Sequence, residues 1–166
     1  MRKVVIAMAA VAALGACASR GEPAPTPTDT TPPPTTTAPR GPVPGSVEDF
    51  RVSVGDRVFF GYDQFDLTPE ARQVLERQAA WLRQYPNVRI LVAGNCDERG
   101  TREYNLALGA RRAAAARDYL VSLGVQPGRV ETVSYGKERP LDARSNEEAW
   151  SVNRNAHTQI VSGAVS

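Results

Sequence analysis

The sequence is poor in the residues that most often carry chemistry. It has one histidine, His157, and two cysteines in 166 residues. No Ser–His pair is apparent, and His157 and Cys96 stand apart, without the spacing of zinc ligands. We therefore expect no metal, no cofactor and no nucleophilic catalysis, and we expect His157 to be a satisfied side chain on an edge strand.

The sequence also lacks an apolar run long enough to cross a membrane. The run over residues 4–14 follows two basic residues and has the length of a secretory signal. It ends in LGAC, residues 14–17, which resembles a bacterial lipobox, in which the cysteine is lipidated and the preceding peptide is removed. This pattern predicts a signal peptide over residues 1–16 and a lipid-anchored Cys17. The alternative is an ordinary signal with a chance cysteine.

Two consequences follow from a lipid anchor at Cys17. Ala18, rather than aspartate, follows the cysteine, and this indicates sorting to the outer membrane, with the protein facing the periplasm. Lipidation of Cys17 leaves Cys96 without a disulfide partner, so we expect Cys96 to be a small, buried packing residue.

The mature chain has no excess of charge of either sign. Arg2 and Lys3 lie in the predicted signal peptide, and without them the basic and acidic side chains number 18 each. The formal charge of +2 therefore gives no argument for nucleic-acid binding.

The segment from Ala18 to Asp49 is rich in proline and threonine. It holds nine of the 13 prolines and almost no apolar residue that could be buried. Such a composition predicts a disordered tether over residues 17–49, following the signal peptide. The composition becomes globular at Phe50, so we predict a single folded domain over residues 50–166.

Hydrophobic periodicity in this domain predicts alternating strands and helices. Strands are expected at 57–62, 87–94, 128–136 and 156–163, helices at 68–86 and 102–123, and a loop with a helical turn before the last strand. Thr68 and Pro69 suit the start of the first helix, and Gly124 suits the end of the second. The order βαβαβ followed by an additional strand predicts an α/β two-layer sandwich. The core face of the second helix is expected at Leu106, Ala110, Ala113, Ala116, Leu120 and Leu123.

The stretch GNCDERGTREYN, residues 94–105, lies where a predicted strand passes into the second helix, a common place for a ligand in α/β folds. Asp97 precedes the helix, and Asn105, Gly109 and Arg112 align on one strip of it. A carboxylate and a guanidinium so placed suit the two ends of a zwitterion. The alternative is a salt bridge between Asp97 and Arg112 beside a solvated loop.

Gly109 has two interpretations. Glycine inside a helix costs about 1 kcal/mol relative to alanine, so its missing side chain is expected to make room for something. A ligand between Asn105 and Arg112 and the close packing of another element are equally compatible with the sequence.

The run GNCDERGTREYNLALGARRAAAARDYL, followed by VSYGKERP and NRNAH, resembles the OmpA C-terminal-like peptidoglycan-binding domain over about residues 55–163. The resemblance implies that the ligand is the diaminopimelate-containing stem peptide of peptidoglycan, held by Asp97 and Arg112. Arg99 falls on the rim of that site, Gly109 stands where serine is common, and Asn95 stands where many relatives have histidine. The ligand-binding residues so implied are Asp97, Arg112, Asn105, Leu108, Thr101, Glu98, Tyr62 and Asp63.

For lipoproteins of this family the resemblance also implies protein partners: the β-propeller protein TolB, and possibly TolA. It implies a non-enzymatic tether between outer membrane and cell wall, with a role in envelope integrity and in constriction at division. A scaffold that acts mainly through TolB is one alternative. Hydrolysis by Asp97, Glu98 and Asp63 is another, and it is disfavoured because neighbouring arginines keep carboxylates ionised.

Overall fold

The structure, a computed structural model, describes residues 41–165. The predicted signal peptide, Cys17 and most of the predicted tether lie outside the described residues. The strands are β1 (Arg57–Phe59), β2 (Arg89–Asn95), β3 (Val130–Gly136) and β4 (Asn155–Ser162). The helices are α1 (Val47–Asp49), α2 (Pro69–Gln84), α3 (Arg102–Ser122) and α4 (Glu147–Asn153), with a π-helical turn at Phe50–Val54 and a 3-10 turn at Pro127–Arg129.

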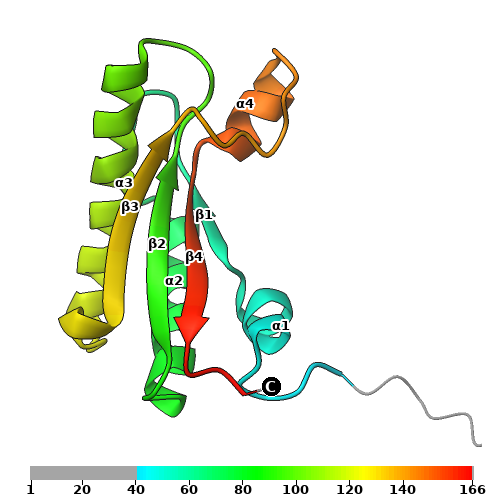
Figure 1. Cartoon of the computed structure of the whole chain (residues 1–166), viewed down its shortest axis with the longest axis vertical. Coiled ribbons are helices and arrows are strands. Elements are labelled where there is room, and N and C mark those ends of the chain that lie inside the picture. Colours follow the sequence, from blue (N-terminus) through cyan, green and yellow to red (C-terminus); the bar gives the residue numbers. More distant parts are fainter. Residues whose placement is uncertain (1–40, 166) are drawn as a thin grey trace, which may run out of the picture. The chain divides into compact units, whose positions relative to one another are not determined.

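The four strands form one sheet in the order β1-β4-β2-β3. β2 and β3 are parallel, and β4 lies antiparallel between β1 and β2. The long helices α2 and α3 lie on one side of this sheet (Figure 1). The predicted α/β two-layer sandwich, with its additional fourth strand, is therefore confirmed.

The position of β4 corrects the expectation for His157. This residue is opposite Arg57 on β1 and opposite Ala93 on β2. It therefore lies on an inner strand and not on an edge strand. The strand order could not be derived from the hydrophobic pattern, because β4 inserts between strands that precede it in the chain.

Local capping chemistry sets the helix boundaries as predicted. Thr68 Oγ1 accepts a hydrogen bond from Ala71 N at 3.2 Å, and Pro69 is the first helical residue of α2. Gly124 ends α3 with a φ of 93°, in the left-handed region that favours glycine. The predicted loop before β4 contains a two-turn helix, α4, whose cap Asn146 accepts from Ala149 N at 2.9 Å.

The first strand is shorter than predicted. Phe60 N donates to Arg154 O at 2.9 Å, and the chain then turns, with Gln64 N donating to Gly61 O at 3.3 Å. Asp63 in this turn has a φ of 55°, which aspartate tolerates better than most residues. Residues 60–62, expected to continue the strand, thus belong to a connection that reaches the carboxyl end of β2.

The apolar core lies between the sheet and the helices α2 and α3. Its fully buried members include Leu75, Leu82, Ile90, Val92, Ala113, Ala116 and Leu120. Phe50 packs edge-on against Trp81, with 5.0 Å between the ring centroids. Trp81 Nε1 donates to Asp49 Oδ2 at 2.9 Å. The packed region therefore begins before residue 50, the position at which we expected the domain to start.

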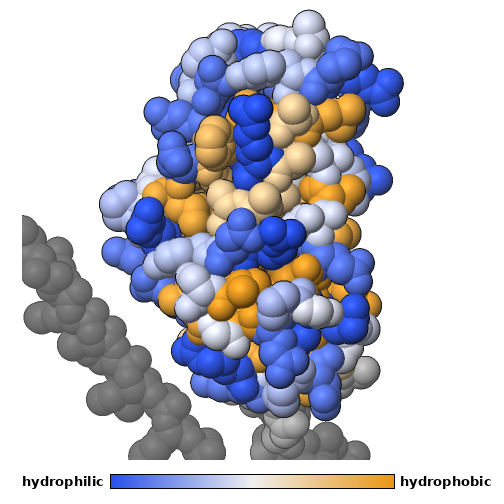
Figure 2. Space-filling model, turned by 90° about the vertical axis from the view of Figure 1, so that its left-hand side faces the viewer, coloured by the Kyte–Doolittle hydropathy of each residue, from blue (hydrophilic) through white to orange (hydrophobic). Residues whose placement is uncertain are grey.

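The predicted core face of α3 is correct only in its second half. Ala113, Ala116 and Leu120 are buried, whereas Leu106 and Ala110 are exposed. The buried residues of the first half are Asn105, Leu108, Gly109 and Arg112. The outward face of α3 belongs to the side seen in Figure 2, where small apolar and charged residues are intermixed.

Close contact between α3 and β2 explains Gly109. A Cβ atom at Gly94 would overlap the carbonyl oxygen of Gly109, and a Cβ at Gly109 would crowd Ser134 Oγ and Gly94 O. The two glycines therefore let helix and strand backbones touch, which supports the packing interpretation of Gly109. Among residues 41–165, no helix combines the length and the apolar character that crossing a membrane requires.

We predict that Gly94→Ala destabilises the fold. The added methyl group has to push α3 away from β2, and overpacking of this kind costs about 1–3 kcal/mol or more. Urea unfolding followed by circular dichroism measures the loss. Gly128→Ala is the matched control, because a Cβ at Gly128 meets open space. An equal effect of both substitutions would contradict the proposed contact.

Candidate functional site

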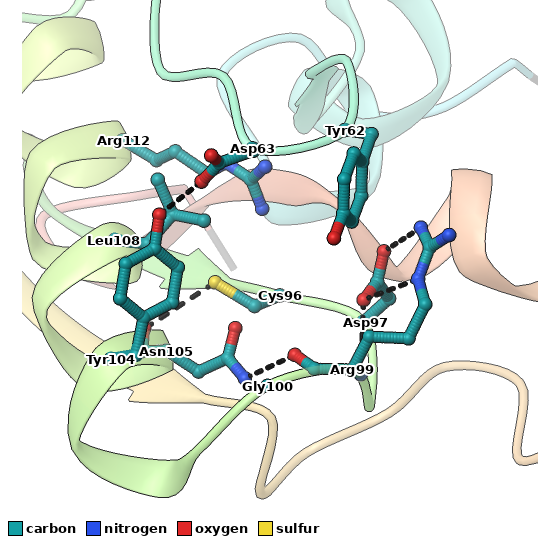
Figure 3. Close-up of a pocket in the computed structure, with 10 residues that line it drawn as sticks. All are labelled: Tyr62, Asp63, Cys96, Asp97, Arg99, Gly100, Tyr104, Asn105, Leu108 and Arg112. Atoms are coloured by element: carbon teal, nitrogen blue, oxygen red, sulfur yellow. Dashed lines mark hydrogen bonds and ion pairs between the residues drawn. The ribbon is translucent and has the colours of Figure 1, made fainter.

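A pocket of about 140 Å³ lies at the carboxyl end of β2 (Figure 3). The turn after β1, the loop after β2 and the first half of α3 form its walls. It is lined by Tyr62, Asp63, Cys96, Asp97, Arg99, Gly100, Tyr104, Asn105, Leu108 and Arg112. Six of the eight predicted binding residues are thus brought together, from segments up to 50 positions apart in the chain.

Arg112 holds three backbone carbonyls at the base of the pocket. Its side chain is almost fully buried, with 1% of its surface exposed. Nε donates to Gln64 O at 2.7 Å, Nη1 to Asn95 O at 2.8 Å and Nη2 to Gly61 O at 3.0 Å. It forms no ion pair with Asp97 in the described part of the chain, so the salt-bridge alternative is wrong.

The Arg112 guanidinium keeps donors to spare. A guanidinium has five N–H groups, and the three hydrogen bonds to carbonyls use one each. Burial lowers the pKa of Arg112, but arginine stays protonated in proteins. One N–H on each terminal nitrogen is therefore left over, and the side chain lines the pocket. This arrangement suits an anionic ligand group.

Asp97 supplies the opposite charge. Its two oxygens accept from Arg99 N at 3.1 Å, Nε at 3.2 Å and Nη2 at 2.6 Å, and from Arg154 Nη1 at 3.3 Å. Burial opposes ionisation, but these hydrogen bonds outweigh it, so the pKa of Asp97 lies below its ordinary value. Asp97 is therefore anionic at neutral pH.

Arg99 and Arg154 were not predicted as partners of Asp97. The Arg99 guanidinium lies between two aromatic rings, 4.2 Å from the centroid of Tyr62 and 4.1 Å from that of Trp150. Arg154 is buried, and it also donates to Phe60 O at 3.1 Å. Arg154 and Trp150 come from the region around α4, so only the resemblance of NRNAH to the family pointed to that segment.

Tyr104 is a further residue that the sequence did not single out. Its hydroxyl donates to Asp63 Oδ1 across the mouth of the pocket (Figure 3), and this bond raises the pKa of Tyr104. The contact joins α3 to the turn after β1. Tyr104 and Tyr62 therefore form two exposed aromatic walls of the site.

Two predicted binding residues do not line the pocket. Thr101 caps α3, where its Oγ1 accepts from Tyr104 N at 3.2 Å. Glu98 Oε1 accepts from Trp150 Nε1 at 3.0 Å. In this structure both residues hold the loop between β2 and α3 in place.

Cys96 is buried, as expected, with 3% of its surface exposed. Its Sγ donates to Asn105 O at 3.4 Å, and burial raises the pKa of the thiol. Cys96 is therefore a neutral thiol at neutral pH. No group of three His, Cys, Asp or Glu residues in the described range is placed to hold a metal ion.

Comparison with known proteins gives a match to the OmpA family over residues 59–154. The chain belongs to the OmpA family. It is 56% identical over 121 residues to the peptidoglycan-associated lipoprotein of Agrobacterium fabrum, covering 73% of this chain and 68% of the relative. Identity to the protein of the same name from Mesorhizobium japonicum is 57%, covering 73% and 71%.

A solved structure shares this fold. The peptidoglycan-associated lipoprotein from Burkholderia pseudomallei is 41% identical, with a TM-score of 0.62, over 63% of this chain and 89% of that one. Within the OmpA family the chain therefore groups with the peptidoglycan-associated lipoproteins, which are not enzymes.

We predict that Asp97→Asn makes stability less sensitive to acid. A carboxyl group with a lowered pKa in the folded chain stabilises the fold above its unfolded value, about 3.9 for aspartate. That contribution is lost as pH falls through the lower, folded value. Asp97→Asn should therefore reduce the free energy of unfolding at about pH 7 and reduce it less at about pH 2.5.

Urea midpoints at the two pH values measure this difference. Asp66→Asn is the control, because Asp66 is exposed and lines no part of the pocket. An equal loss of stability at both pH values would show that the charge of Asp97 does not stabilise the fold.

Proposed function

We propose that this pocket binds the diaminopimelate-containing stem peptide of peptidoglycan non-covalently. Diaminopimelate carries a carboxylate and an ammonium on one carbon atom. The observation that supports this ligand is the pairing of the ionised Asp97 with a buried Arg112 that has two unused N–H groups, in one pocket. Arg112 receives the carboxylate and Asp97 receives the ammonium.

The ammonium meets a carboxylate that already has partners. Four hydrogen bonds from Arg99 and Arg154 fill the acceptor positions of Asp97. The side chain of Arg154 is buried, whereas that of Arg99 is 30% exposed. The ligand ammonium therefore replaces an N–H of Arg99, while Arg154 stays in place.

The other pocket residues give the site its shape. Asn105 Nδ2 donates to Arg99 O at 2.7 Å and to Thr101 O at 3.1 Å, so its Oδ1 is left to accept from the ligand. Leu108 supplies an apolar floor for the methylene chain of diaminopimelate. Tyr62 and Asp63 border the stem on the opposite wall.

The cellular role that we propose follows from the family, from the predicted lipid anchor at Cys17 and from the folded domain that follows it. Lipid at Cys17 holds the protein in the outer membrane, and the proline-rich segment between Cys17 and the packed residues around α1 forms an arm that lets the folded domain reach the wall from the periplasmic side. The relatives named peptidoglycan-associated lipoprotein support this role. As part of a Tol–Pal system, the protein pairs with TolB, and possibly TolA, and helps the outer membrane follow the wall at division.

We predict that Asp97→Asn weakens binding of a diaminopimelate stem peptide about tenfold or more, because a charge-assisted hydrogen bond is lost. Calorimetric titration measures the affinity. Asp118→Asn is the matched control, since Asp118 is an exposed aspartate near the far end of α3. Equal affinity of the two variants would remove Asp97 from the site.

Arg112 is better tested through the ligand than by substitution. Its side chain holds three carbonyls, so Arg112→Ala disturbs the fold as well as the site. A stem in which the diaminopimelate carboxylate is amidated removes the same contact and leaves the protein intact. We expect it, and the lysine-type stem, to bind at least about tenfold more weakly.

The titration also decides between the two proposed roles. Selective binding of the diaminopimelate stem supports a wall anchor. If the chain binds none of the stems, the alternative of a scaffold that acts mainly through TolB gains support.

A further inference from the structure

A second pocket lies on the face of the sheet that α2 and α3 do not cover. On β4, Thr158 Oγ1 donates to Gln78 of α2 at 2.9 Å. Because side chains alternate along a strand, the neighbours His157 and Gln159 point to the opposite face. There they line a pocket of about 240 Å³, together with Asn95, Tyr135, Arg139 and Arg57.

Two oxygen acceptors in this pocket have no partner. Asn95 is 8% exposed, and both N–H groups of its Nδ2 are used, by Ala93 O at 3.2 Å and by Asn155 Oδ1 at 2.9 Å. Its Oδ1 accepts no hydrogen bond from residues 41–165. The same holds for Gln159 Oε1, whose amide nitrogen donates to His157 Nδ1 at 3.1 Å. Neither oxygen is among the fully buried side-chain atoms of residues 41–165 that lack a partner, so both face the open pocket, where a ligand with N–H or O–H donors can reach them.

The pocket also carries one uncompensated positive charge. The Arg139 guanidinium lies 3.7 Å from the centroid of the Tyr135 ring and forms no ion pair within the described residues. Arg57 is neutralised by Asp56, at 2.9 Å. Burial lowers the pKa of His157, so its ring adds no charge at neutral pH. Arg139 is therefore the cation that remains available to an anion.

We propose that this open-face pocket binds a carboxylate flanked by N–H or O–H donors. The carboxylate pairs with Arg139, and the donors meet Asn95 Oδ1 and Gln159 Oε1. Cell-wall polymer offers this chemistry from two sources, the carboxyl end of a peptide and a carboxylated amino sugar. The choice of these two sources rests on the proposed function. The observation of unpaired groups in the pocket is independent of it.

The two pockets are distinct, although they meet at one residue. The backbone oxygen of Asn95 accepts from Arg112, which lines the first pocket, while the Asn95 side chain lines the second. A ligand in the open-face pocket therefore leaves the first pocket accessible.

The test is a nuclear magnetic resonance titration of the full-length, 15N-labelled chain in detergent micelles. The probes are N-acetyl-D-alanyl-D-alanine for the peptide source and N-acetylmuramic acid for the sugar source. N-acetylglucosamine is the control, because it lacks the carboxylate. We expect at least one acid to shift the side-chain amide signals of Asn95 and Gln159 saturably, with a Kd on the order of 1 mM. We expect N-acetylglucosamine to bind at least about tenfold more weakly.

Variants then assign the charge. Arg139→Gln should weaken binding of the acid about tenfold, because the exposed side chain of Arg139 supplies the positive charge that pairs with the carboxylate. Arg144→Gln makes the same change on the same loop, at an arginine that is paired with Asp142 at 2.6 Å, and should leave binding unchanged. Asp97→Asn should also leave it unchanged, which separates this site from the first.

Which acid binds identifies the source, and either result supports the proposal. No saturable shift with either acid overturns it, as does equal binding of N-acetylglucosamine or unchanged binding in Arg139→Gln. Shifts confined to the signals of Asn105 and Leu108 would also overturn it, because the acid would then occupy the first pocket. None of these failures bears on whether the stem peptide binds at Asp97.

Discussion

The hydrogen bonds of Arg112 to three backbone carbonyls are the interaction on which the site depends. They join the turn after β1, through Gly61 and Gln64, to the end of β2, through Asn95. A buried guanidinium is stable only when its donors are satisfied, and here carbonyl oxygens satisfy most of them. Because no carboxylate of residues 41–165 neutralises it, the positive charge stays available. One side chain therefore shapes the pocket and supplies its cation.

The carboxylate side of the pocket is built on a different principle, an alternation of charges. Asp97 lies between Arg99 and Arg154, and Arg154 in turn pairs with Glu147 at 2.8 Å. Burying a charge is costly unless it is paired, and this network lets Asp97 be buried while it stays ionised. Of the two arginines that contact Asp97, Arg99 is the more exposed. The aromatic rings of Tyr62 and Trp150 pack against its guanidinium. The site thus has a partly exposed donor, Arg99, at its mouth and a buried one, Arg154, behind it.

Much of the fold was readable in the sequence because it rests on local chemistry. Thr68, Pro69 and Gly124 act on backbone groups within a few residues, so their roles as caps follow from spacing alone. The buried apolar residues of β2 and of the second half of α3 also lie where the hydrophobic periodicity of a strand and of a helix predicts them. The first half of α3 does not, because there a polar strip with Asn105 and Arg112 faces inward. Periodicity identifies apolar faces and gives no signal for a buried polar one.

The sequence by itself determined the order of the main strands and helices and the ends of the long helices, and it placed Asp97 just ahead of α3 and Arg112 in the middle of it. That the two residues serve one ligand site was implied by the family resemblance. Only the tertiary structure decided that these two residues do not bond to each other. Arg154, which contacts Asp97, is 57 positions away. Gly94 and Gly109 touch across strand and helix. Such contacts depend on how β4 inserts into the sheet and how closely α3 packs, and neither is encoded in local spacing.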